Sequence, residues 1–135
     1  MTPFARWLRG LVARFRPFFF WLWIGGLIAL APLSWLPQTT PPTGIGNVEL
    51  SLDKVFHFIA YGGLAGLAML VFLDTRKRRW AVAIVLLASV GYEIGQIWAP
   101  GRSFGWDDLT ANVLGWLLGV ALGWLICRTP PRQLT

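Results

Sequence analysis

Three groups of polar residues interrupt long apolar stretches of this chain and offer acid–base and hydrogen-bonding chemistry. The first group is Asp53, His57 and Tyr61, the second is Ser89, Glu93 and Gln96, and the third is Asp108 and Asn112. Residues three or four positions apart lie on the same side of a helix, so each group marks one helix face. Imidazole, carboxylate, amide and phenol groups can exchange protons or hydrogen-bond to a polar ligand. A site built from them requires three helices whose marked faces meet.

The stretches that carry these groups have the length and composition of transmembrane helices. They belong to a set covering residues 18–36, 55–73, 80–99 and 109–127, in which Glu93 is the one formal charge. At roughly 1.5 Å per residue, each is about as long as the hydrocarbon core of a bilayer is thick. A mean hydropathy of +0.58 and 56% apolar residues exclude a disordered chain and an ordinary soluble protein. The sequence therefore predicts an all-α membrane protein, a bundle of four transmembrane helices.

Positive charges gather at one end of the predicted bundle. The chain has 12 Lys and Arg residues against 6 Asp and Glu residues, and only Lys54 and Arg102 among the basic residues fall at the other end. Because Lys and Arg in short loops stay on the cytoplasmic side, we expect both termini in the cytoplasm and the polar groups near the outer surface. The expected location is the bacterial cytoplasmic (inner) membrane, crossed several times. The short connections leave no room for a nucleic-acid module or a separate soluble domain.

Residues 1–17 form a basic leader, followed by the membrane domain at 18–127 and a cytoplasmic tail at 128–135. Apolar residues and arginines separate onto opposite arcs of residues 4–16, which predicts an amphipathic helix lying in the membrane interface. The alternative is a disordered leader that only fixes topology. The longest connection, 37–52, is rich in Pro, Thr and Gly, and Val48, Leu50 and Leu52 alternate with polar residues as in a short extended cover over the bundle.

Small residues recur at fourfold spacing in three of the predicted spans. They are Gly62, Gly66, Gly91, Gly95, Gly115, Gly119 and Gly123. Glycines at this spacing let helix backbones approach closely in lipid. We expect them to pack the helices of one chain together, and dimerisation of two chains is the alternative.

Glu93 is costly to place in a membrane. It lies about 9 Å inside the end of its span at roughly 1.5 Å per residue, and a charge at mid-membrane costs about 2.5–3.5 kcal/mol. It needs a partner, a proton or an aqueous cavity, which a pocket at the meeting point of the three polar faces supplies. The predicted pocket faces outward and binds its ligand through Asp53, His57, Tyr61, Glu93, Gln96, Arg102, Asp107, Asp108 and Asn112.

The same residues form separated motifs in a fixed order. These are Asp53-Lys54-x-x-His57-x-x-x-Tyr61, Glu93-x-x-Gln96, Pro100-Gly101-Arg102-Ser103-Phe104 and Asp108-x-x-x-Asn112-x-x-Gly115. Over residues 53–119 the pattern resembles the VanZ-like family of membrane proteins, with signature positions at Asp53, His57, Glu93, Gln96, Arg102, Asp108 and Asn112. The resemblance implies a small helical membrane protein, and the family's namesake is associated with resistance to the glycopeptide antibiotic teicoplanin.

The chain departs from the family pattern just before its last span. Many relatives have an acid near position 105 and an apolar residue near position 107, whereas this chain has Gly105 and Asp107. A role that requires the acid at 105 is therefore absent here or has moved to Asp107.

Three functions fit these residues. In the first, the pocket binds a lipid-linked or cell-wall polar head group and modulates the cell envelope or glycopeptide susceptibility, with Arg102 holding an anionic group. In the second, an intramembrane enzyme uses His57 and Glu93 as acid and base on a lipid-linked envelope substrate. In the third, Glu93 carries protons for a transporter, but the inner half of each span lacks a polar residue to continue the path.

Structural roles and metal binding are the remaining interpretations. Asp53, Asp107 and Asp108 stand near helix N-termini, where carboxylates cap helices. Arg102 can pair with Asp107 or Asp108, and a His57–Glu93 pair can be purely structural. One His with the carboxylates of Asp53, Glu93 and Asp108 also suits a divalent cation, but the spacing alone predicts neither a metal nor a cofactor. The expected partners are membrane lipids or a lipid-linked envelope precursor and not nucleic acid, and the oligomeric state is left open.

The topology can be tested by labelling single cysteines in intact cells. Cysteines introduced at Thr43 and at Gly105 should react with an impermeant thiol reagent added outside, because both positions lie at the end that is poor in Lys and Arg. A cysteine at Thr75 should stay unlabelled, and its labelling would overturn the orientation.

Overall fold

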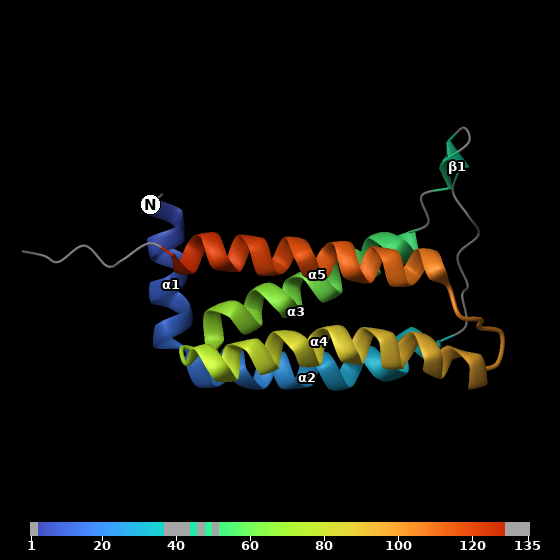
Figure 1. The fold of residues 1–135 in the computed structure, drawn as a ribbon, viewed down its shortest axis with the longest axis horizontal. Helices are drawn as coiled ribbons and strands as arrows, with labels where there is room; N and C mark the ends of the chain where they lie inside the picture. Colours follow the sequence, from blue (N-terminus) through green and yellow to red (C-terminus); the bar gives the residue numbers. More distant parts are fainter. Residues whose placement is uncertain (1–2, 37–43, 46–47, 50–51, 129–135) are drawn as a thin grey trace, which may run out of the picture.

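A computed structural model describes residues 3–36, 44–45, 48–49 and 52–128 of the chain. Its elements, labelled in Figure 1 where there is room, are α1 (Pro3–Arg14), α2 (Arg16–Trp35), β1 (Gly44–Ile45), β2 (Val48–Glu49), α3 (Leu52–Val71), α4 (Thr75–Gly95), the 3-10 helix η1 (Gln96–Trp98) and α5 (Trp106–Cys127). Four helical segments, namely α2, α3, α4 continued by η1, and α5, are long and apolar enough to cross a membrane. The predicted bundle of four transmembrane helices is thus confirmed.

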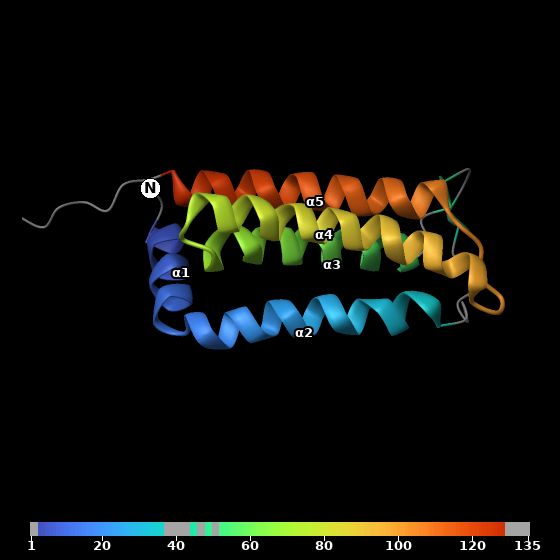
Figure 2. The same ribbon diagram turned by 60° about the horizontal axis from the view of Figure 1, so that its bottom comes forward.

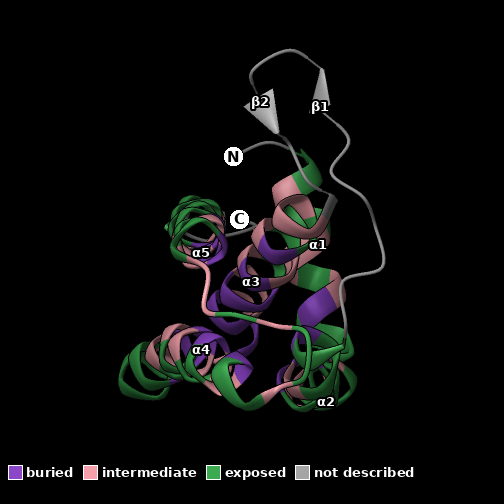
Figure 3. Cartoon of the chain, turned by 90° about the vertical axis from the view of Figure 1, so that its right-hand side faces the viewer, coloured by how far each residue is buried: buried purple, intermediate pink, exposed green. Residues whose placement is uncertain are grey.

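The four long helices run side by side, and α1 lies across one end of them (Figures 1 and 2). α3 contacts each of the other three long helices and packs most extensively against α5. Buried residues lie on the sides of the helices that face one another (Figure 3). The core includes Trp23, Leu27, Tyr61, Leu64, Ala65, Ala68 and Val85.

The helices begin earlier in the sequence than the apolar stretches that predicted them. The stretches 18–36, 55–73, 80–99 and 109–127 correspond to helices that start at Arg16, Leu52, Thr75 and Trp106. Backbone hydrogen bonds close a helix irrespective of side-chain polarity, so polar residues at the membrane boundary continue it. Hydropathy locates the part of a helix that lies in lipid and not the helix ends.

The basic run 76–79 precedes the predicted span 80–99 and lies in the first turns of α4. Cations at a helix N-terminus oppose the helix dipole. Asp74 offsets this, because its Oδ1 accepts a hydrogen bond from the Lys77 backbone N–H at 2.8 Å and caps the helix.

The predicted leader helix is confirmed between Pro3 and Arg14, which excludes a disordered leader over those residues. Val12 is buried against the end of the bundle, whereas Phe4 and Trp7 remain exposed. Of the predicted tail, 128–135, only Arg128 lies within the described residues. The predicted extended cover in 37–52 falls largely outside them, although β1 and β2 pair in an antiparallel manner and Leu52 already belongs to α3.

The tryptophans near the span ends divide into two environments. Exposed side chains, as expected for an aromatic belt, belong to Trp21, Trp35, Trp80, Trp98, Trp106 and Trp124. Trp23 also lies near a span end but is buried in the core, where its ring makes an edge-on contact with the Phe72 ring. Its position along the chain gives its depth in the membrane but not the side of α2 that it occupies.

Glycines of α3 and α5 form the closest helix contact. A Cβ atom built on Gly62 would stand 2.9 Å from the Gly115 carbonyl oxygen, and one built on Gly119 would collide with the carbonyl oxygen of Gly62. The predicted packing within one chain is confirmed for these two helices. It is wrong for Gly91 in α4, which faces open space in the structure.

A methyl group added at this contact should destabilise the bundle. Gly119→Ala is expected to lower the free energy of unfolding by about 1–3 kcal/mol, because the backbones must separate to admit the Cβ atom. Circular dichroism during unfolding in mixed micelles measures the change. Gly63→Ala is the matched control on α3, since nothing lies within 4 Å of its Cβ position. An equal loss in both variants would show that the close approach does not matter.

Candidate functional site

Three spans bring buried polar side chains together at the end of the bundle opposite α1. The end is assembled from the start of α3, the end of α4 with η1, and the start of α5, because consecutive spans run in opposite directions. His57, Glu93, Gln96 and Asn112 form what we call the buried polar cluster, and their exposed fractions are 4%, 1%, 0% and 0%. The three polar faces predicted from the sequence therefore meet.

Asn112 is the central bridge of the buried polar cluster. Its Oδ1 lies 2.9 Å from His57 Nδ1, and its Nδ2 donates to Glu93 Oε1 at 3.4 Å. An amide oxygen can only accept, so with this orientation of the amide the imidazole donates. Gln96 Nε2 donates to the same Glu93 oxygen at 3.3 Å. One carboxylate oxygen thus organises side chains from all three spans.

The His57 ring lies between two carboxylates. Its Nε2 is 3.8 Å from Asp53 Oδ1, and its Nδ1 is 3.7 Å from Glu93 Oε1. Tyr61 stacks on the ring with a centroid separation of 6.2 Å and an interplanar angle of 24°. These contacts fix the plane of the imidazole between the two carboxylates.

Arg102 closes the outer side of the cluster with partners that were not predicted. Its Nη1 lies 3.3 Å from Asp53 Oδ2, and its Nε donates to the Leu36 carbonyl oxygen at 2.7 Å. The expected pairing with Asp107 or Asp108 is wrong. Since these contacts occupy the guanidinium, Arg102 ties the end of α2 to the first turn of α3.

Asp107 and Asp108 occupy different environments although they are adjacent. Asp107 is exposed and pairs with Lys54, whose Nζ lies 2.5 Å from its Oδ2, whereas Asp108 is buried. A Cβ atom built on Gly105 would stand 2.8 Å from Asp108 Oδ2. The Asp108 carboxylate therefore occupies the space next to the Cβ position of residue 105. Asp107 therefore lies outside the buried polar cluster, and Asp108 is the acid nearest to position 105.

Two buried acceptor atoms of the cluster have no hydrogen-bond partner among the described residues. They are Oε2 of Glu93 and Oε1 of Gln96. A buried acceptor without a donor costs about 1–3 kcal/mol, and more when it is charged. A ligand, a proton on the carboxylate or a buried water can supply the missing donor.

The space beside the cluster is small. A cavity of about 20 Å³ is lined by polar and apolar residues of α2 and α3, which include Ser34, Asp53, His57 and Tyr61. A space of this size holds about one water molecule. In this conformation the site admits a single polar group and not a whole head group.

Nothing in the described part of the chain gathers three or more His, Cys, Asp or Glu side chains in a way that could hold a metal ion. Asp53, His57, Glu93 and Asp108, the set considered for a divalent cation, are therefore not brought together as such a group. Ser89 donates to the Leu86 carbonyl oxygen at 2.8 Å within its own helix and is not aligned with a base.

Sequence reasoning missed the partners that hold the periphery of the site. Lys54 is one residue from Asp53 and reaches a different helix. Trp35 Nε1 donates to the Tyr92 carbonyl oxygen at 3.2 Å, and the Tyr92 hydroxyl donates to the Leu27 carbonyl oxygen at 2.8 Å, so two hydrogen bonds join α2 to α4. The sequence signal for these contacts was the presence of Trp and Tyr near the span ends, because their N–H and O–H groups need an acceptor when they are buried.

The VanZ/LLP1 family model matches residues 1–127. No curated protein and no solved structure matches the chain. The matched range includes α1 and α2, so the similarity extends well beyond the motifs of residues 53–119.

Removing the central bridge should destabilise the protein. Asn112→Ala leaves His57 without its acceptor and Glu93 without one donor, so the free energy of unfolding is expected to fall by about 1–3 kcal/mol. Thr110→Ala, at an exposed position of the same helix, should change it by less than about 0.5 kcal/mol. Reversible unfolding in micelles compares the two, and an unchanged Asn112→Ala would show that the bridge contributes nothing.

Proposed function

The chain belongs to the VanZ/LLP1 family, and on that premise we propose that it binds the polar head group of a lipid-linked or cell-wall molecule at the buried polar cluster. It does so in the bacterial cytoplasmic membrane, with the cluster near the outer surface. Binding modulates the cell envelope and the susceptibility of the cell to glycopeptide antibiotics such as teicoplanin.

The observation that carries this proposal is the pair of unpartnered buried acceptors, Glu93 Oε2 and Gln96 Oε1. Both atoms require a donor. Sugar hydroxyls, peptide amides and amines are the donors that envelope head groups offer. A carboxylate in its ionised form accepts stronger hydrogen bonds than a neutral amide does, so Glu93 in that form would be the main anchor for the ligand.

The depth of the cluster fits a lipid-linked ligand. His57 lies five residues into α3, which is about 7–8 Å from the start of the helix at roughly 1.5 Å per residue. The head group of a molecule with its chain in the bilayer lies near this level. One polar group of that head enters the cluster while the remainder stays at the membrane surface, which agrees with the small cavity beside His57.

In this proposal Arg102 controls access to the buried polar cluster and is not the primary anion-binding residue. Its guanidinium is engaged by Asp53 and by the Leu36 carbonyl oxygen. An anionic ligand would compete with Asp53 for it. Exchange of that partner would loosen the link between α2 and α3 on the side from which the ligand approaches.

The second candidate function is an intramembrane enzyme acting on a lipid-linked envelope substrate. The placement of the His57 ring between Asp53 and Glu93 favours it, because carboxylates on both sides orient an imidazole for proton transfer. His57 and Glu93 would serve as acid and base. Ser89 bonds within its own helix, so water would have to be the nucleophile.

Substitutions at the cluster test the proposal in a teicoplanin-sensitive bacterial host. Glu93→Gln keeps the side-chain shape and loses the charge, so it should abolish any change in the inhibitory concentration that the wild-type protein causes. The folded amount in the membrane should stay close to wild type. Asp107→Asn is the matched control, because Asp107 is exposed and pairs with Lys54 outside the cluster, and it should behave as wild type.

Mass spectrometry of lipids that copurify with the protein gives a second readout. Wild type and Asp107→Asn should retain a lipid-linked head-group molecule, and Glu93→Gln should lose it. The proposal is contradicted if three folded single variants, Glu93→Gln, His57→Ala and Gln96→Leu, all still retain the lipid-linked molecule and all still change the antibiotic response. Release of inorganic phosphate from a lipid-linked phosphate, dependent on His57, would favour the enzyme instead.

A further inference from the structure

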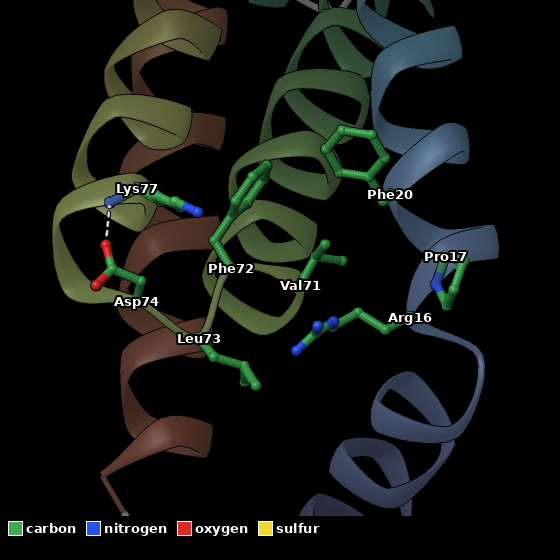
Figure 4. A pocket seen from close by; sticks show the side chains of 8 residues that line it. All are labelled: Arg16, Pro17, Phe20, Val71, Phe72, Leu73, Asp74 and Lys77. Atoms are coloured by element: carbon green, nitrogen blue, oxygen red, sulfur yellow. Dashed lines mark hydrogen bonds between the residues drawn. The ribbon is translucent and has the colours of Figure 1, made fainter.

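A second region of the molecule, at the end of the bundle near α1, has its own cavity. Its volume is about 400 Å³, which lies in the range of small-molecule sites. The lining residues come from the start of α2, the end of α3 and the start of α4, and Figure 4 shows them as Arg16, Pro17, Phe20, Val71, Phe72, Leu73, Asp74 and Lys77. We call it the basic-end cavity. None of these residues belongs to the buried polar cluster.

Positive charge dominates the polar part of this lining. In Figure 4 the Arg16 side chain extends from α2 toward Leu73, and the Lys77 side chain extends from α4 toward the ring of Phe72. Within the described residues, neither the Arg16 guanidinium nor the Lys77 ammonium forms an ion pair. Asp74 is the one carboxylate of the lining, and its Oδ1 already accepts from the Lys77 backbone N–H at 2.8 Å.

The remaining wall is apolar and belongs to the spans. Phe20 lies one turn into α2 from Arg16, Val71 is the last residue of α3, and Phe72 follows directly after it. Figure 4 shows the Phe72 ring near the Lys77 side chain, and the Phe20 ring packs against Phe72 with a centroid separation of 5.9 Å. A ligand that fills the cavity therefore needs an anionic part for Arg16 and Lys77 and an apolar part for the aromatic wall.

We infer that the basic-end cavity binds the phosphate group of an anionic phospholipid, with Arg16 and Lys77 holding the phosphate and Phe20 and Phe72 contacting the chains. Arg holds a phosphate through a fork of N–H donors, and Lys adds a compact charge. Basic pockets between transmembrane helices are suited to anionic head groups. A soluble anion would use the charges but leave the aromatic wall uncovered.

The neighbouring surface supports an anionic occupant. A smaller cavity of about 140 Å³ shares Arg16 and Leu73 with the basic-end cavity and is lined also by Arg9 and Arg78. Arg78 donates to the Phe72 and Leu73 carbonyl oxygens, which keeps the end of α3 in place beside Arg16. Because α1 carries further arginines across this end, the local potential favours anions over zwitterions.

Native mass spectrometry of the full chain in detergent tests the inference. Phosphatidylglycerol and phosphatidylcholine with identical oleoyl chains are titrated onto the protein. Phosphatidylglycerol should bind roughly 25-fold more tightly, and the double substitution Arg16→Gln with Lys77→Gln should remove most of that preference, since each cation contributes about a fivefold effect. Both residues are exposed, so the variant is expected to fold, and circular dichroism verifies this.

The matched control is the double substitution Arg76→Gln with Arg79→Gln, which removes the same charge from exposed positions of α4 outside the cavity. It should keep the preference within about twofold, because unbound surface charges are screened. Equal losses in the two double variants would overturn the location of the site. Equal binding of the two lipids by wild type would overturn selectivity for the anion.

Soluble anions separate a lipid site from a general phosphate site. Inorganic phosphate and glycerol 3-phosphate should fail to displace phosphatidylglycerol at concentrations far above that of the lipid. Phe20→Ser should weaken lipid binding because it removes part of the aromatic wall. Displacement by inorganic phosphate, together with unchanged binding by folded Phe20→Ser, would overturn the lipid as occupant.

Discussion

The close approach of α3 and α5 is the constraint on which the site depends. Gly62, Gly115 and Gly119 leave no room for a Cβ atom between the two backbones. Apolar side chains gain little by leaving lipid for a protein interface, so close van der Waals contact has to hold such helices together. At this short backbone distance Asn112 on α5 reaches His57 on α3 within 2.9 Å. A wider spacing would separate the donor from the acceptor and leave both buried without a partner.

α4 joins this pair by a different kind of contact. Gly91 faces open space, and polar groups add to the apolar contacts of the helix: the Trp116 indole donates to the Val82 carbonyl oxygen at 2.9 Å. Glu93 adds its carboxylate to the Asn112 amide at the other end. The cost of burying that carboxylate is offset only in part, since one of its oxygens lacks a donor among the described residues. Close glycine packing therefore builds the α3–α5 pair, whereas polar contacts and buried side chains such as Val85 attach α4 to it.

Helix periodicity was sufficient to predict which faces meet, because His57, Glu93 and Asn112 are the residues that lipid excludes most strongly. It could not predict the partner of Arg102. That contact depends on the path of the chain between η1 and α5, where Gly101 adopts a φ of 74°, and on Leu36, which is far away in sequence. The depth of a residue in the membrane follows from its position along a span. The residue that a loop side chain contacts depends on the path of the backbone, which the spacing of residues in the sequence does not give.

The ion pairs at the end opposite α1 bear on how the chain enters the membrane. Lys54 and Arg102 are the two basic residues at that end, and each is accompanied by a carboxylate, Asp107 or Asp53. Moving an isolated elementary charge through a potential of about 100 mV takes roughly 2.3 kcal/mol. A segment that carries a cation together with an anion crosses as a nearly neutral unit, so the potential exerts little net force on it. Ten of the twelve basic residues belong to the other end, so positive charge is distributed unevenly along the axis of the bundle.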